Sequence, residues 1–341
     1  MDSNTIKDKF HQNVNDISLS FINAFNLEFT QAVPNLDDPL HRWMDFRMRY
    51  INPVPRTLLF SSKFPKKLSV EVQKGLDLLM IKLREGGDVN KYQSKSLIRF
   101  NDSSGKRKSK RTDLLWADWA ITHLHITDKP CDYDEQYSER ACSNGESWLL
   151  FCLVFEDTVC VIDVHRHDKE DVFSDLSLLK TVKDSWPEYL EQFKMIGVRP
   201  TQEPHSFTDK EVGQSRRAGI SLPLTIDGDI FVGPGLGITC AATPLRVGRQ
   251  CNSLHRWVEQ LANLVATDSQ IIDDLNDACV VEPVISLCVT PQGLAVYEEE
   301  SRRAYTFPVK EDKDYNLNMS LLLSPEWAVN KLVSEGVFEP V

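Results

Sequence analysis

Two histidine doublets are the residues of this chain whose types and spacing could do chemistry. His123 and His125 end one apolar run, and His165 and His167 end another. Side chains on a strand alternate between its two faces, so each doublet presents both rings to one side. An imidazole titrates near neutrality, so paired rings can accept and donate a proton within one reaction cycle. The sequence therefore predicts a site at which up to four imidazoles gather.

The elements that must position these rings are three apolar runs of about strand length within residues 113–173. The second and third runs, 148–156 and 158–164, are separated only by a turn, and their β-branched and aromatic composition predicts a hairpin. A strand at 56–62 and an amphipathic helix at 68–84 precede them. If the first and third runs flank the middle one, the histidines meet at one end of a β-meander.

Cleavage of RNA is one reaction that suits such a site. One group removes the proton of the 2′-hydroxyl, another protonates the leaving 5′-oxygen, and cations stabilise the phosphate between them. The candidate catalytic residues are His125, His167, Asp163, Arg166, His123 and His165. Hydrolase motifs built on Ser or Cys, and phosphate-binding loops, are absent from the sequence. No cofactor is expected.

A basic block lies inside an otherwise acidic chain. Residues 42–111 hold 18 Lys and Arg against 6 Asp and Glu, a local balance of +12, whereas the net charge of −11 leaves −23 for the rest. Such a block is expected for a polyanionic partner. The alternative is an ordinary solvated loop. The candidate nucleic-acid-binding residues of this kind are Lys106, Arg107, Lys108, Lys110, Arg111 and Arg140.

Composition favours a soluble globular protein, because 41% of residues are apolar and 26% are charged. No apolar run approaches the ~20 residues of a membrane span, and the first residues lack a secretory signal pattern, so a cytoplasmic protein without membrane contact is expected. The cysteines form no C-x-x-C motif.

The expected fold class is α+β. Residues 1–55 form a helical N-terminal extension, and 56–197 an α+β domain in which a helix pair packs on the antiparallel meander. Residues 198–215 are a linker, since they carry prolines and no periodicity. Residues 216–341 form a second, β-rich α+β domain, in which Asp227-Gly228 indicates a two-residue hairpin turn.

The order of strand, helix and meander ending in histidine resembles the RelE/YafQ superfamily of bacterial toxin ribonucleases over about residues 56–175. The nearest likeness is to the YafQ branch, on whose pattern His125-Ile126, residues 148–151, His167 and Phe173 can be laid. The chain departs from that pattern in an insertion at 127–147. Further departures are a spacing of six residues between His167 and Phe173 rather than about four, and the additional parts on both sides.

The resemblance implies an mRNA-cleaving toxin of a toxin–antitoxin system, acting without metal and often on the ribosome. By carry-over, His125 and His167 are the acid–base pair, and Phe173 helps to hold a base or the strand. The implied partners are RNA, which includes ribosome-bound mRNA, and an antitoxin or an intramolecular restraint by the acidic C-terminal half. The added parts would recognise the target or regulate the activity.

Two other interpretations stay open at the level of sequence. The four histidines with Asp163 could bind a metal, because an H-x-H pair on a strand presents both rings to one side. The chain would then be a metal-dependent hydrolase or nuclease. Alternatively, the histidines are structural, and the protein is a non-enzymatic regulatory or interaction protein.

Overall fold

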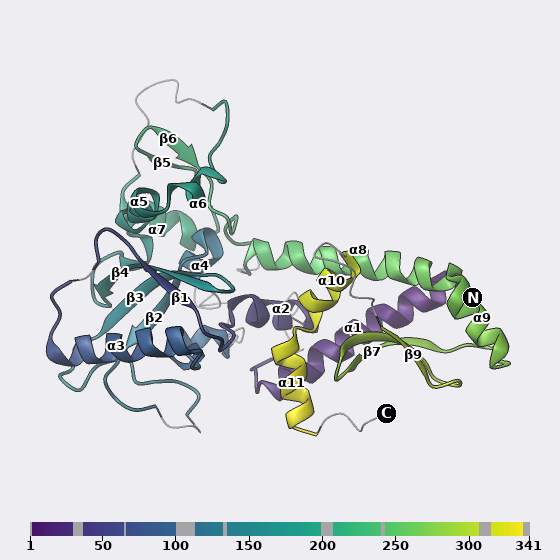
Figure 1. Ribbon diagram of the computed structural model, residues 1–341. Coiled ribbons are helices and arrows are strands. Elements are labelled where there is room, and N and C mark those ends of the chain that lie inside the picture. The colour runs from purple at the N-terminus through teal and green to yellow at the C-terminus, as the bar shows by residue number, and fades with distance from the viewer. Residues whose placement is uncertain are drawn as a thin grey trace. The chain divides into compact units, whose positions relative to one another are not determined.

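The computed structural model describes residues 2–29, 37–64, 66–99, 113–131, 135–198, 207–239, 243–306 and 315–336, and it has the expected mixed α+β fold (Figure 1). The described helices are α1 (Ser3–Ala24), α2 (Pro39–Arg49), α3 (Val70–Glu85), α4 (Leu114–Trp119), α5 (Leu176–Ser185), α6 (Pro187–Glu191), α7 (Asp209–Arg217), α8 (Leu245–Thr267), α9 (Ser269–Asp277), α10 (Tyr315–Leu323) and α11 (Glu326–Ser334). The described strands are β1 (Thr57–Phe60), β2 (Thr122–Ile126), β3 (Trp148–Val154), β4 (Thr158–Arg166), β5 (Leu224–Ile226), β6 (Asp229–Phe231), β7 (Ile285–Thr290), β8 (Gly293–Glu298) and β9 (Arg303–Thr306).

The predicted strand, helix and meander form one four-stranded sheet with the order β1-β4-β3-β2. β1 pairs with β4 in parallel, and the other two pairs are antiparallel. A parallel pair needs a crossover connection, and α3 lies within it. This helix ends where the sequence predicts, because Gly86 adopts a left-handed conformation at a φ of 80° that favours glycine.

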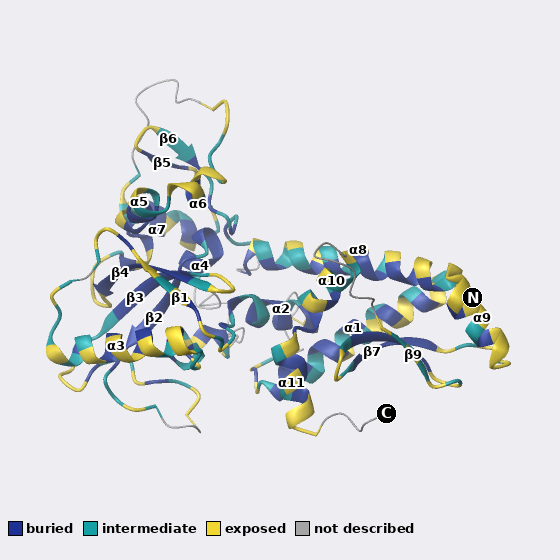
Figure 2. Cartoon of the chain, in the orientation of Figure 1, coloured by how far each residue is buried: buried dark blue, intermediate teal, exposed yellow. Residues whose placement is uncertain are grey.

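Both faces of this sheet are buried across β2, β3 and β4, whereas the edge strand β1 is largely exposed (Figure 2). α3 packs on one face, where its apolar stripe meets side chains such as Leu124, Leu150 and Val164. The other face carries Leu149, Phe151 and neighbouring side chains, and apolar residues of α4, α5 and α7 cover it. The predicted helix pair is thus a single long helix on one face and a group of shorter helices on the other.

A β-bulge in β4 changes which side chains of that strand point to which face. The pairing runs from Cys152 opposite Val161 to Phe151 opposite Asp163, so Ile162 is one residue more than β3 matches. Side chains directly opposite each other share a face of the sheet. Before the bulge, Val161 therefore lies on the α3 side with Cys152. After it, Asp163 and the following odd-numbered residues lie on the side covered by α4 and α5.

The contacts divide the chain into two compact units whose boundaries differ from the expected domains. One unit comprises residues 49–246 and contains the meander. The other joins the chain up to Met48 with the chain from Val247 on, so the N-terminal helical segment belongs with the C-terminal part. The physical reason is the apolar stripe of α1, which is buried in this unit beside β7, where Asn13 accepts a hydrogen bond from Leu287 N at 3.0 Å.

The segment expected as a linker also contributes to the unit of residues 49–246. Its end forms α7, which begins at a capping box of Thr208 and Glu211 and buries Val212 in the core of the sheet. The hairpin predicted at Asp227-Gly228 is present as β5 and β6. From residue 245 on, the structure alternates helices with the three-stranded β7-β8-β9 sheet.

No helix in the described ranges combines the length and the apolar character that crossing a bilayer requires.

Candidate active site

The two histidine doublets lie on the same face of the sheet because their strands are in register across β3. His125 is opposite Leu149, and Leu149 is opposite His165. His167 lies one row further on, where its backbone N–H donates to the Ser147 carbonyl at 2.9 Å. The expected juxtaposition therefore depends on the bulge, since without it the β4 histidines would face α3.

The histidine rings that meet are determined by the size of the side chain that lies between them, Ser147 just before β3 or Leu149 on β3. Ser147 is small, and the His167 ring lies stacked with His125 at a centroid distance of 5.4 Å and an interplanar angle of 28°. Leu149 is large and fully buried between His125 and His165. The second doublet is consequently divided, and only His167 joins the first one.

Phe173 completes this group from the short turn of 3-10 helix at Val172–Ser174. Its ring lies 5.0 Å from that of His123 and 5.9 Å from that of His167, while His123 and His125 are 5.8 Å apart. We call these four residues the ring cluster. His123 and His125 are 6% and 7% exposed, Phe173 is 36% exposed, and His167 is exposed. The cluster thus has a buried floor and an accessible rim.

Asp113 orients the buried ring of His123. One carboxylate oxygen accepts from the backbone N–H groups of Leu115 and Trp116 at 3.1 Å and thereby caps α4. The other lies 2.7 Å from His123 Nδ1. Burial alone would raise the pKa of Asp113, but the nearby His123 and Arg49 outweigh it and hold this pKa below its usual range. An ionised Asp113 therefore places a negative charge beside the buried His123 ring.

α4, and with it Asp113, is held by contacts to the following part of the chain. Asp118 forms a buried ion pair with Arg216 Nε of α7 at 2.7 Å and accepts a hydrogen bond from Ser221. A β-carbon at Gly235 would come within 1.8 Å of the Ala117 carbonyl oxygen, so only glycine fits against the helix there. The glycine-rich segment that the sequence marks as turn chemistry is therefore also a packing surface for α4.

The ring cluster contains a histidine that stays neutral. Burial lowers the pKa of His125 to about 2, and the neighbouring His123, Arg140, His167 and Lys95 side chains act in the same direction. Its Nδ1 is buried and has no hydrogen-bond partner among the described residues. Burial also lowers the pKa of His167, and the nearby Asp168 carboxylate partly opposes this shift. The cluster thus combines a desolvated neutral imidazole with a more accessible one.

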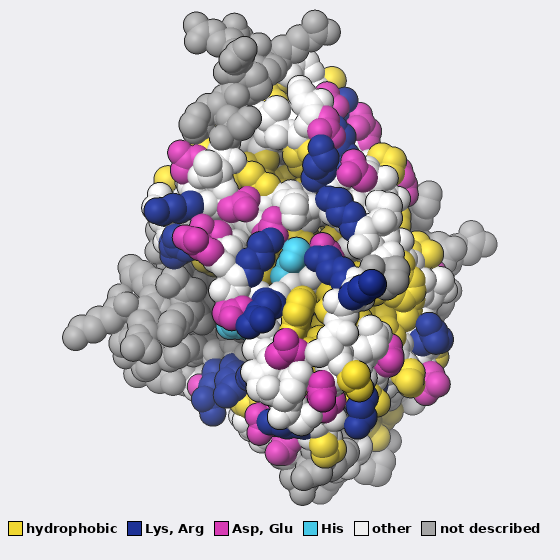
Figure 3. Space-filling view, turned by 90° about the vertical axis from the view of Figure 1, so that its left-hand side faces the viewer, with side chains coloured by type: hydrophobic (Ala, Val, Ile, Leu, Met, Phe, Trp, Pro, Cys, Tyr) yellow, Lys and Arg dark blue, Asp and Glu magenta, His cyan; other side chains and the backbone are white. Residues whose placement is uncertain are grey.

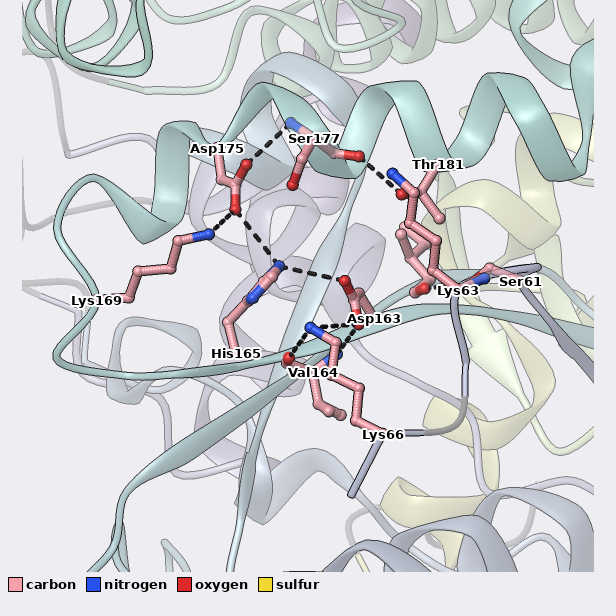
Figure 4. A network of polar contacts seen from close by, with 11 residues as sticks. Ser61, Lys63, Lys66, Asp163, Val164, His165, Lys169, Asp175, Ser177 and Thr181 are labelled. Atoms are coloured by element: carbon pink, nitrogen blue, oxygen red, sulfur yellow. Dashed lines mark hydrogen bonds and ion pairs between the residues drawn. The ribbon is translucent and has the colours of Figure 1, made fainter. Parts of the chain in front are cut away.

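His165 lies in a different setting, a network of ions (Figure 4). Its Nε2 lies 3.5 Å from an Asp163 oxygen and 3.4 Å from an Asp175 oxygen. Lys66 lies 3.0 Å from Asp163, and Lys169 pairs with Asp175. We call these five residues the ion network. Burial lowers the pKa of His165, and the two carboxylates oppose that shift.

The carboxylates of the ion network are buried, whereas its lysines reach the surface, with side chains 35% and 41% exposed. On the face drawn in Figure 3, a histidine lies among Lys and Arg side chains, with acidic groups between them. Within the network, each carboxylate lies beside a lysine and His165. Of the candidate catalytic residues, Asp163 and His165 belong to this network rather than to the ring cluster.

The remaining candidates are placed as follows. Arg166 points away from both histidine groups and pairs with Asp168 through two contacts of 3.0 Å, with 52% of its side chain exposed. Arg140 lies near the ring cluster, since its charge acts on His125 and His167. The predicted basic residues Lys106, Arg107, Lys108, Lys110 and Arg111 lie outside the described residues.

Three residues beside the candidate sites were missed by sequence reasoning, namely Asp113, Asp175 and Tyr137. Both aspartates are N-caps, of α4 and α5, and an Asp just before an apolar helical run is a signal that could have located them. Their second role, the contact with a histidine, has no such signal. Tyr137 lies in the insertion at 127–147, and three cations surround its ring.

Within the described ranges, no three His, Cys, Asp or Glu side chains are grouped so that they could hold a metal ion. Comparisons with protein-family models, with curated proteins and with solved structures find no match to this chain.

Proposed function

We propose that this chain is a toxin-like endoribonuclease that cleaves RNA at the His125–His167 pair by metal-independent general acid–base chemistry. The observation that carries the proposal is the stacked contact of these rings at 5.4 Å, with an unpartnered nitrogen on the buried one. Two imidazoles in contact, one neutral and one accessible, are suited to take up and deliver a proton on either side of one phosphate.

The roles follow from the surroundings of each ring. His125 is unprotonated at physiological pH, because burial lowers its pKa to about 2, so within this pair it can act only as the acceptor of the 2′-hydroxyl proton. The 2′-oxygen then attacks the adjacent phosphorus. His167 is exposed, and in its protonated form it donates a proton to the departing 5′-oxygen and becomes neutral. The products are a 2′,3′-cyclic phosphate and a 5′-hydroxyl end.

The other members of the ring cluster support this pair. His123 Nδ1 lies 2.7 Å from an Asp113 carboxylate oxygen, and the His123 ring forms part of the buried floor of the ring cluster. Phe173 presents an exposed ring edge between His123 and His167, where a base can stack. Arg140 provides positive charge for the phosphate.

The proposal includes a cellular setting. The substrate is RNA in the cytoplasm, which includes mRNA bound to ribosomes. A chain that cleaves its own cell's RNA needs restraint, and an antitoxin or the acidic remainder of this chain would supply it. This regulation belongs to the proposal and rests on the charge division of the sequence.

The test is cleavage of an end-labelled single-stranded RNA by the purified full chain in EDTA, in parallel with mRNA in a translation extract. His125→Ala and His167→Ala should each lower the rate by about 10²–10⁴-fold, because each removes a proton-transfer group. His125→Asn repeats the test with a polar side chain at the buried position, and thermal unfolding checks that each variant is folded.

The matched control is His255→Ala, which alters a histidine of the other compact unit and should cleave like the wild type. An oligonucleotide with 2′-deoxy sugars should remain intact, since it lacks the attacking hydroxyl. If the wild type leaves RNA uncut in both arms, or if folded His125 and His167 variants cut at the wild-type rate, the proposal is wrong.

A further inference from the structure

The two edges of the four-stranded sheet differ in their exposure. β2, at one end of the order β1-β4-β3-β2, is buried along its whole length, whereas β1, at the other end, is exposed at most of its positions. An edge strand presents backbone groups to which another strand can add, and proteins commonly protect such edges with lysine, proline or a covering element. The sequence of β1, Thr-Leu-Leu-Phe, contains neither lysine nor proline. The β1 edge is therefore suited to pairing.

The backbone of β1 is hydrogen-bonded on one side only. Thr57 N donates to the Asp157 carbonyl at 2.8 Å, so the odd-numbered residues of this strand bond towards β4. Backbone groups of successive residues in a strand point to alternate sides, so the N–H and C=O groups of Leu58 and Phe60 point away from the sheet. Within the described ranges, these groups have no hydrogen-bond partner.

The side chains along this edge are apolar on both faces of the sheet. Leu58 packs against the core that α3 covers, so Phe60 lies on that face and Leu59 on the opposite one. Leu59 is 42% exposed and Phe60 is 45% exposed, and the Phe60 ring lies 5.3 Å from that of Phe64. A strand added beside β1 would remove apolar surface from water on both faces, which favours association.

The charges at the two ends of the edge have opposite signs. Lys63 is exposed and follows the C-terminal end of β1 by three residues. Glu156 and Asp157 are exposed and lie at its N-terminal end, because Asp157 bonds to the first residue of the strand. The edge thus has a basic end and an acidic end.

This polarity favours one occupant, a second copy of the same strand in antiparallel orientation. In such a pair, the C-terminal end of each strand lies beside the N-terminal end of the other. Lys63 of each copy then lies near Glu156 and Asp157 of the other, so both ends of the interface are complementary. A parallel pair would instead bring like charges together at both ends.

We propose that β1 pairs antiparallel with β1 of a second copy of this chain, so that two four-stranded sheets become one continuous sheet across a two-fold axis. The outward-pointing residues fix the register. Leu58 of one copy lies opposite Phe60 of the other and exchanges both backbone hydrogen bonds with it, and Leu59 lies opposite Leu59 on the axis. This inference is independent of the proposed nuclease function.

The first test is the oligomeric state of the full chain, measured by sedimentation velocity over a range of concentrations. The wild type should show a monomer–dimer equilibrium. Phe60→Pro removes an outward N–H but no bond to β4, and proline is tolerated on an edge strand. It should raise the dimer dissociation constant by about tenfold or more, because each copy loses one backbone hydrogen bond and an apolar contact.

The matched control is Ile81→Thr on α3, which removes an apolar side chain that is also 45% exposed but lies outside the edge. It should dimerise like the wild type. Thermal unfolding checks that each variant is folded.

Charge reversal tests the orientation of the pair. Lys63→Glu alone, and Glu156→Lys with Asp157→Lys in one chain, each bring like charges together at both ends and should weaken self-association. An equimolar mixture of these two variants should dimerise again, because opposite charges then meet at both ends.

A cysteine on the axis tests the register. Leu59→Cys should give a disulfide-linked dimer under mild oxidation, because opposed residues of this kind of pair have Cα atoms about 4.5 Å apart, within disulfide range. Thr57→Cys lies on the same face but away from the axis, and it should not link to its counterpart. Peptide mapping separates the new link from any made by the exposed Cys279.

Two results would refute the proposal. One is a wild type that stays monomeric at every concentration, which would leave the edge to an extended segment of another protein. The other is a dimer that Phe60→Pro leaves unchanged, which would place the interface elsewhere. Failure of the mixed charge variants to associate, or of Leu59→Cys to link, would exclude the antiparallel register.

Discussion

The ring cluster and the ion network contain histidines from the same i, i+2 doublet, yet they are opposite electrostatic environments. His165 lies between two carboxylates, each of which also meets a lysine. His167 lies against another imidazole and a phenyl ring, with the charges of Arg140 and Asp168 nearby. His165 on β4 and His167 just beyond its end face the same side of the sheet, so the difference arises from their neighbours. A histidine motif alone therefore does not identify a reactive group.

The comparison also separates stability from chemistry. The ion network joins β4 to the N-terminus of α5, because Asp175 caps that helix and also contacts His165. Buried ring nitrogens without a hydrogen bond occur in both groups, but His165 Nε2 lies 3.4–3.5 Å from two carboxylates, whereas His125 Nδ1 has no charged partner of that kind among the described residues, which costs free energy unless a ligand pairs with it. We expect substitutions in the network to affect unfolding and substitutions in the cluster to affect activity.

The largest expected contrast is between His165→Ala and His167→Ala. The first should lower the free energy of unfolding by about 1–3 kcal/mol, because it leaves two buried carboxylates without the ring between them. RNA cleavage should persist. The second should abolish cleavage with little change in stability, since His167 is exposed. Denaturant unfolding and the cleavage assay, applied to both variants, check the pair. A loss of cleavage in folded His165→Ala would remove the distinction.

The pH dependence of stability should show the buried imidazole directly. The pKa of His125 is about 2 in the folded chain against about 6.5 when unfolded, so below pH 6.5 only the unfolded state takes up the proton. Stability is therefore lost as the pH falls, by about 2 kcal/mol between pH 7 and pH 5 from this residue alone.

His125→Gln should flatten that slope when denaturant unfolding is measured at both pH values. His165→Gln is the matched comparison, and it should flatten the slope less, because Asp163 and Asp175 oppose the lowering of the His165 pKa. Equal slopes in wild type and His125→Gln would mean that His125 is hydrated and not desolvated.

The smallest expected effect concerns the lysines of the ion network. Lys169→Met should lower the free energy of unfolding by only about 0.5 kcal/mol, since a partly exposed pair is screened by solvent. Cleavage should be unchanged. Lys180→Met, which breaks an exposed pair with Asp227, is the control for a surface lysine. A much larger effect for Lys169→Met would indicate that Asp175 depends on this lysine.

Local patterns in the sequence predicted much of the fold. The hairpin of β3 and β4, the end of α3 at Gly86 and the turn at Asp227-Gly228 all rest on neighbouring residues, and all are present. The association of α1 with the C-terminal part was not predictable in this way. An apolar stripe shows that a helix will be buried but does not show its partner.

The candidate site was predictable to a lesser degree. Alternation along a strand correctly predicts that the two rings of each doublet lie on one face of the sheet. Whether both doublets lie on the same face depends on the pairing register across β3. The exclusion of His165 depends on Leu149, and the admission of His167 on Ser147. These are contacts across strands, and a single sequence does not reveal which residues lie opposite each other.

The bulge at Ile162 has a consequence for how this site can change. Successive side chains of a strand point to opposite faces, so the face of each residue depends on how many residues precede it. Deleting Ile162, between Val161 and Asp163, would therefore keep all four imidazoles but turn His165 and His167 to the face that α3 covers. Substituting Ile162 by another apolar residue would leave the count intact. A chain that retains both histidine doublets but lacks the extra residue here would have the same sequence motif without the contact between His125 and His167.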